Sequence, residues 1–111
     1  MNAKTLFLPA LASALLLVAS AAAAQENGDA ARGRDLAKRN CSGCHGTEAD
    51  DVRSPLAKAP TFKAVADTAG MSPFALMAWF RGPHKSMPDF IVASGDVRDL
   101  AAYILSLKTP Q

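Results

Sequence analysis

This chain of 111 residues has few of the residues that usually stabilise a small domain. Two cysteines are too few for a framework of several disulfides, and one tryptophan, one tyrosine and five phenylalanines offer little aromatic surface for a core. No internal repeat and no long linker divides the chain, so we expect a single domain. A formal net charge of +2 gives no reason to expect a nucleic-acid partner.

The first 24 residues have the three parts of a secretory signal. Lys4 precedes an apolar run, and small residues follow up to Ala24. We expect cleavage after Ala24 and a domain of residues 25–111 in the periplasm. An uncleaved membrane anchor is the alternative, but a proline and a serine break the run, which is shorter than the roughly 18 apolar residues of a spanning helix. No later segment is apolar enough to span a bilayer, so no stable membrane insertion is expected after cleavage.

The sequence Cys41-Ser42-Gly43-Cys44-His45 places two thiols and an imidazole at the spacing that covalent haem attachment uses. Each thiol can form a thioether with one haem vinyl group, and Gly43 permits the tight turn that reaches both. His45 follows directly and supplies an imidazole as an axial ligand of the iron. We therefore expect one covalently bound haem c, whose large apolar surface would also complete the core.

Three other kinds of site use two closely spaced thiols. A thioredoxin-type dithiol pair follows a strand, whereas the segment before Cys41 is charged and rich in alanine. A structural zinc ion normally has four ligands, and His84 is the one further donor of the usual nitrogen or sulfur type. A disulfide between Cys41 and Cys44 would close a loop too short to add much stability. It would also leave His45 without a role, so haem attachment is favoured.

The pattern of apolar and capping residues predicts an all-α fold. Asp29 can cap a first helix that ends near Asn40 and leads into the thiol motif. Residues 46–60 are predicted to form a surface loop, because acidic residues and prolines dominate them. A short helix is expected over residues 61–68, and Gly70 is suited to end it with a positive φ.

Two further helices are predicted in the second half of the chain. Ser72 is a good cap, followed by a proline at the first helical position. Residues 74–80 are apolar throughout, so we expect this helix to be buried between the haem and the rest of the fold. A last helix is expected from about residue 96 to 108, with Ser94 or Asp96 as its cap.

The second axial ligand decides whether the iron is closed or open. Met71, Met77, Met87 and His84 are the candidates. We favour Met87, because prolines on both sides limit the freedom of its backbone, whereas Met77 lies in an apolar helix where methionine usually packs. His84 is the rival, since imidazole is a strong iron ligand. A thioether favours ferrous iron more than a second imidazole does, so the two choices predict different reduction potentials.

Together these features resemble the class I c-type cytochromes, particularly the short bacterial ones with one haem. The matching residues are Gly33 eight positions before the motif, Cys41 to His45, Met87 with Pro88, and Asp99 to Ile104. The resemblance implies the cytochrome c fold, in which four or so short helices wrap around one haem and the first and last helices cross. It also implies that Gly33 permits a close approach near Leu100 and Tyr103.

The resemblance implies roles for residues outside the motif. In the family, a proline carbonyl after the motif often accepts a hydrogen bond from the axial histidine, which orients the ring and raises its basicity. Pro60 is the expected counterpart, with Pro55 as the alternative. Trp79 is expected either to donate its indole N–H to a haem propionate or to pack as an ordinary aromatic residue.

A haem iron with both axial positions filled cannot readily bind a substrate, so we expect an electron carrier and not an enzyme. Its partners would be redox proteins that donate and accept one electron by outer-sphere transfer, in transient encounters with a monomer. Lys58, Lys63, Arg81 and Lys85 could ring the haem edge and attract an acidic partner. The alternatives are a haem c subunit of an oxidoreductase complex, a peroxidase-like enzyme with an open iron position, and a sensor of a diatomic gas.

Overall fold

The computed structural model describes residues 28–82, 86–87 and 92–111. Its helices are α2 (Ala30–Asn40), α3 (Phe62–Asp67), α4 (Pro73–Arg81) and α5 (Ser94–Ser106). No strand occurs among these described residues, so the predicted all-α fold class is confirmed. Over the same ranges, none of the helices is long and apolar enough to cross a membrane.

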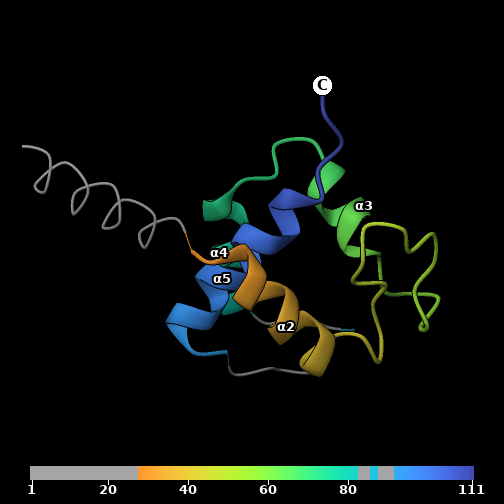
Figure 1. Cartoon of the computed structure of the whole chain (residues 1–111), viewed down its shortest axis with the longest axis horizontal. Coiled ribbons are helices and arrows are strands. Elements are labelled where there is room, and N and C mark those ends of the chain that lie inside the picture. Colours follow the sequence, from red (N-terminus) through yellow and green to blue (C-terminus); the bar gives the residue numbers. More distant parts are fainter. Residues whose placement is uncertain (1–27, 83–85, 88–91) are drawn as a thin grey trace, which may run out of the picture.

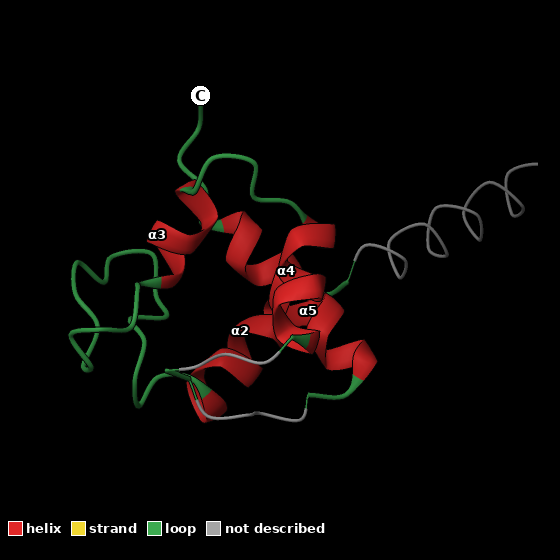
Figure 2. Cartoon of the chain, turned by 180° about the vertical axis from the view of Figure 1, so that it is seen from behind, coloured by secondary structure: helices red, strands yellow, loops and turns green. Residues whose placement is uncertain are grey.

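The helix α5 is the centre of the fold, because it packs against each of the other three helices. Figures 1 and 2 show from opposite sides how α2 crosses it, as predicted for the first and last helices of the domain. One face of α5 is buried and supplies half of the core. Its buried residues, each 5% exposed or less, are Val97, Leu100, Ala101, Tyr103 and Ile104. They recur at helical spacing, so this stripe is readable from the sequence.

The helices α2 and α5 approach closely because Gly33 has no side chain. A Cβ atom at this position would overlap the carbonyl oxygen of Asp99 and would lie 2.8 Å from Cβ of Tyr103. The predicted close approach is confirmed near Tyr103, and its other contact is the carbonyl group of Asp99, which precedes Leu100. The close approach lets Leu36, one turn further along α2, join the core.

Polar contacts fix the start of α2 on α5. Asp29 caps α2 as predicted, because its carboxylate accepts a hydrogen bond from the N–H of Arg32 at 3.1 Å. The N–H of Asp29 in turn donates to the carboxylate of Asp99 at 2.8 Å. Arg32 also forms ion pairs with Asp96 at 3.0 Å and with Asp99 at 3.2 Å. The two helices are therefore held both by packing and by charge.

The start of α5 differs from the prediction. The helix begins at Ser94 and not near residue 96, its N-cap is Ala93, and no side chain donates or accepts a capping hydrogen bond there. The prediction that Ser94 or Asp96 caps this helix is wrong. Asp96 lies within the first turn, where its carboxylate suits the helix dipole and pairs with Arg32 of α2.

The helix α4 is less buried than its apolar composition predicts. Ser72 caps it, accepting a hydrogen bond from the N–H of Ala75 at 3.1 Å. Only Leu76 is buried in this helix, whereas Phe74 is 83% exposed and Trp79 is 62% exposed. Among the described helices α4 packs against α5 alone, so the protein covers one side of it, and its burial against the haem stays a prediction.

The short helix α3 begins as predicted but ends earlier. Thr61 caps it by accepting a hydrogen bond from the N–H of Ala64 at 3.2 Å. Its C-cap is Thr68, in an extended conformation, so Gly70 does not end the helix. Gly70 has the expected positive φ of 75°, and the turn that leads toward α4 requires it.

The segment after α5 is fastened to α3 through Asp67. The N–H of Thr109 donates to this carboxylate at 2.7 Å, the Thr109 hydroxyl donates at 2.9 Å, and Lys63 forms an ion pair with it at 3.0 Å. The hydrogen bond from the Thr109 backbone, with the help of Lys63, lowers the pKa of Asp67 from 3.8 to about 2. The end of the chain is thus fixed by an ionised carboxylate.

Replacing Gly33 by alanine is expected to destabilise the protein by about 2 kcal/mol or more, because the new methyl group overlaps a backbone carbonyl and forces the helices apart. Chemical denaturation of both proteins measures this change. Gly95→Ala is the matched control, since it adds the same methyl group inside α5 where nothing lies within 4 Å. A Gly33→Ala protein as stable as Gly95→Ala would contradict the close crossing.

The Asp67 contacts predict a dependence of stability on pH. Because the pKa of Asp67 is about 2 in the folded protein and near 3.8 otherwise, its contribution is present above about pH 4 and is lost as the pH falls toward 2. Asp67→Asn should lack this part of the dependence in denaturation curves measured between pH 2 and pH 5. Asp50→Asn, the same change in the exposed loop, should keep it. Identical curves for the two variants would refute the contact.

Candidate functional site

One cavity brings together the four side chains that the sequence singled out for a haem. Its volume is about 240 Å³, and its lining includes Cys41, Cys44, His45 and Met87. Apolar walls come from three helices, namely from Leu36 of α2, Phe80 of α4 and Leu100 of α5. Two thiols, an imidazole and a thioether in an apolar cavity are the donor set of a covalently attached, axially ligated haem.

The end of α2 positions the two thiols. Cys41 is the C-cap of this helix, and its N–H donates to the carbonyl of Ala37 at 2.8 Å. The chain then turns tightly, because the N–H groups of Cys44 and His45 both donate to the Cys41 carbonyl, at 3.1 and 2.9 Å. No disulfide joins the two cysteines. Burial raises the pKa of the Cys41 thiol, so before attachment it stays protonated at neutral pH.

The imidazole of His45 is held by the backbone of Pro60. Its Nδ1 atom lies 2.7 Å from the Pro60 carbonyl oxygen, as the resemblance implies, and Pro55 does not take this place. A carbonyl only accepts, so Nδ1 carries the proton and Nε2 keeps a free lone pair for a metal ion. The ring of Phe62 lies against the imidazole, with centroids 5.4 Å apart. The tautomer and the orientation of the ring are therefore both fixed.

The loop between the motif and α3 delivers Pro60 to His45. The N–H of Leu56 donates to the Cys44 carbonyl at 3.1 Å, and the N–H of Gly46 donates to the Ser54 hydroxyl at 3.0 Å. Phe62 closes the loop, because its N–H donates to the Gly46 carbonyl at 2.8 Å. The predicted surface loop thus folds back on the thiol motif, as the expected contact of Pro60 requires.

The remaining predicted site residues are distributed as follows. Met87 is half-buried and lines the cavity, whereas Met71 packs against the core and neither it nor Met77 lines the cavity. Trp79 lies on the exposed part of α4, outside the lining. His84 lies outside the described residues.

The four basic residues expected around the haem edge do not share one environment. Lys58 and Arg81 are exposed, and Lys85 lies outside the described residues. Lys63 is engaged on α3, where its ammonium group pairs with Asp67 and contacts Thr109. Lys58 and Arg81 are thus the two described members of the set that remain at the surface.

Two polar residues of the cavity are not apparent from the sequence. Asn40 and Asp96 both contribute to its lining, and Asp96 is neutralised by its ion pair with Arg32. Within the described ranges, no group of three or more His, Cys, Asp or Glu side chains is arranged to hold a metal ion.

The site and the helical fold define a c-type cytochrome. The model of a protein family described as "Cytochrome C oxidase, cbb3-type, subunit III" matches residues 28–104, and the chain belongs to this family of cytochrome c domains. It is also similar to a protein named Cytochrome c-552 from Bradyrhizobium diazoefficiens, with 37% identity over 94 residues. The aligned region covers 85% of this chain and 89% of that relative. No solved structure gave a significant match.

Family membership establishes the cofactor and the general activity. The chain binds haem c covalently and serves in electron transfer, as predicted, and its partners are redox proteins. Bound haem supplies the one-electron redox couple of its iron. The protein supplies the attachment thiols, a cavity with apolar walls and a histidine whose ring is fixed.

Proposed function

We propose that this protein is a periplasmic carrier that passes one electron at a time by outer-sphere transfer, with His45 and Met87 as the axial ligands. The observation that carries the proposal is that both side chains line the same cavity as the two attachment thiols. Two protein ligands close the iron to substrates, which suits electron transfer and not catalysis. An iron that keeps both protein ligands in its two oxidation states also causes little rearrangement of the atoms around it.

The proposed ligands favour opposite oxidation states of the iron. The hydrogen bond from His45 to the Pro60 carbonyl makes the imidazole more basic, which favours ferric iron. The thioether of Met87 favours ferrous iron and raises the reduction potential. The reduction potential of the haem iron therefore depends on both ligands. A hydrogen bond from Trp79 to a haem propionate stays a prediction.

Docking of a redox partner is proposed to use the exposed basic residues that remain available. Lys58 and Arg81 are both exposed, and positive charge attracts an acidic partner and speeds the encounter. Encounters of this kind bury little surface and separate quickly. A monomer with transient partners is therefore the proposed working state.

A second candidate function is that of a haem c subunit in an oxidoreductase complex. The description of the matched family, which names an oxidase subunit, favours it. The match to Cytochrome c-552 over 89% of that relative favours a small separate carrier. A stable complex with other chains would distinguish the two functions.

Met87 ligation predicts a charge-transfer band at the far-red end of the visible spectrum of the ferric protein. We expect Met87→Ala to abolish this band, because the sulfur ligand is lost. Met71→Ala and Met77→Ala are the matched controls and should keep it, since neither side chain lines the cavity. His84→Ala should keep it as well. A band that survives in Met87→Ala, or a high-spin ferric wild type at neutral pH, would contradict the closed iron.

The periplasmic proposal predicts the mass of the protein purified from its native periplasm. We expect the mass of residues 25–111 plus one haem, because cleavage after Ala24 and two thioethers are both proposed. Size-exclusion chromatography in the same preparation should give a monomer. A mass that includes the first 24 residues would refute the cleavage, and co-purification as a stable hetero-complex would favour the subunit function.

A further inference from the structure

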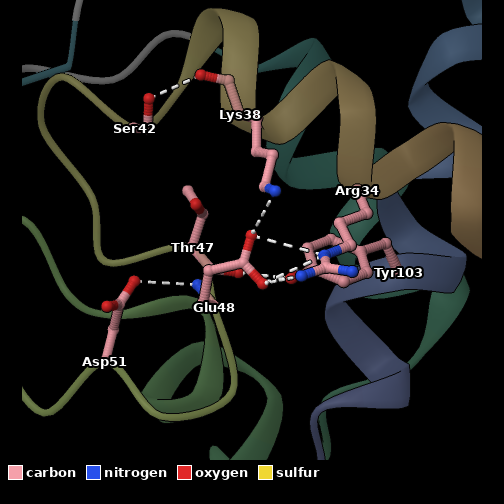
Figure 3. A network of polar contacts seen from close by, with 7 residues as sticks. All are labelled: Arg34, Lys38, Ser42, Thr47, Glu48, Asp51 and Tyr103. Atoms are coloured by element: carbon pink, nitrogen blue, oxygen red, sulfur yellow. Dashed lines mark hydrogen bonds and ion pairs between the residues drawn. The ribbon is translucent and has the colours of Figure 1, made fainter.

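The residue two positions after His45 is fixed by a buried hydrogen bond that haem attachment does not require. The hydroxyl of Tyr103, a side chain only 5% exposed, donates to the carbonyl of Thr47 at 2.6 Å. Thr47 itself is 3% exposed. Figure 3 shows Tyr103 reaching this segment from α5. The central helix is thus bonded to the backbone just beyond the proposed axial ligand.

The next residue is held by α2. The carboxylate of Glu48 accepts three hydrogen bonds from Arg34, two from Nε at 3.0 and 3.3 Å and one from Nη2 at 2.7 Å. It also lies 3.5 Å from Nζ of Lys38. The N–H of Glu48 donates to Asp51 at 2.8 Å. In Figure 3 the Glu48 side chain points toward both basic residues. The hydrogen bonds from Arg34 lower the pKa of Glu48 and keep it ionised at neutral pH.

Three consecutive residues after His45 are therefore bonded to three different parts of the fold. Gly46 is bonded to the loop and to Phe62 at the start of α3, Thr47 to α5, and Glu48 to α2. The imidazole is fixed on its other side by the Pro60 carbonyl. Gly46 is bonded covalently to His45, and the Pro60 carbonyl accepts the hydrogen bond from its imidazole. A shift of residues 46–48 would therefore change the distance from Nδ1 to that carbonyl.

We propose that the Tyr103 hydroxyl is a positioning group for His45, which acts through the Thr47 carbonyl to keep the imidazole in hydrogen-bond contact with Pro60. The inference rests on the proposed role of His45 as axial ligand. A buried carbonyl that loses its donor is costly, so the segment moves to find another partner. The hydrogen bond from His45 to Pro60 then weakens, and the imidazole becomes less basic. A less basic imidazole stabilises ferric iron less, so the reduction potential of the haem rises.

The test compares Tyr103→Phe with the wild type, both loaded with haem. Exchange of the His45 Nδ1 proton in the ferrous protein, followed by NMR, reports on the Pro60 contact directly. We expect exchange to be roughly fivefold to tenfold faster in Tyr103→Phe, as the loss of one hydrogen bond implies, and the midpoint potential to shift upward. Ser106→Ala is the matched control, because it also removes a hydroxyl of α5, one that donates to the Tyr103 carbonyl at 2.5 Å.

Glu48→Gln is the second variant. It removes the charge that Arg34 and Lys38 bind while leaving the Tyr103 hydroxyl in place. We expect the exchange of the His45 Nδ1 proton to become faster and the midpoint potential to rise, both by less than in Tyr103→Phe. Unchanged exchange and potential in Tyr103→Phe, or changes no larger than in Ser106→Ala, would overturn the positioning role. The far-red band separates the two proposals. Its absence from the wild type refutes ligation by the Met87 sulfur, whereas its presence with unchanged exchange refutes only the role of Tyr103.

Discussion

The close crossing of α2 over α5 is the constraint on which the rest of the structure depends. Gly33 allows it, since any side chain there would meet the backbone of Asp99. The crossing fixes the position in space of the C-terminal end of α2. Cys41 is the C-cap of this helix, so the position of the thiol motif is fixed as well. It also places Leu100 on the cavity wall and Tyr103 against the segment after His45. A single glycine thus links the packing of the core to the geometry of the haem site.

The site is built in layers around the histidine. Pro60 fixes the tautomer of His45, Gly46 anchors the loop that carries Pro60, and Tyr103 ties the same segment to the central helix. Rigid surroundings suit an electron carrier, because a site that reorganises little loses little energy when the iron changes its charge.

Features set by neighbouring residues could be predicted from the sequence, and features set by distant contacts could not. The caps Asp29, Thr61 and Ser72 each bond an N–H three residues away, so local chemistry specifies them. The start of α5 differs from the prediction, and the ion-pair partner of Asp96 in its first turn is Arg32, 64 positions away in the sequence. The contact of Tyr103 with Thr47 spans 56 positions and has no local signal. The choice of Pro60 over Pro55 likewise depends on how the whole loop folds.

The central claim is that His45 and Met87, which line the same cavity, are the two axial ligands of the haem iron. X-ray absorption at the iron edge of the haem-loaded protein measures the ligand atoms directly. The account predicts one sulfur atom and one histidine nitrogen in addition to the porphyrin nitrogens, in both oxidation states. A first shell with no sulfur, whether it holds a second imidazole, a water molecule or an open position, would contradict it.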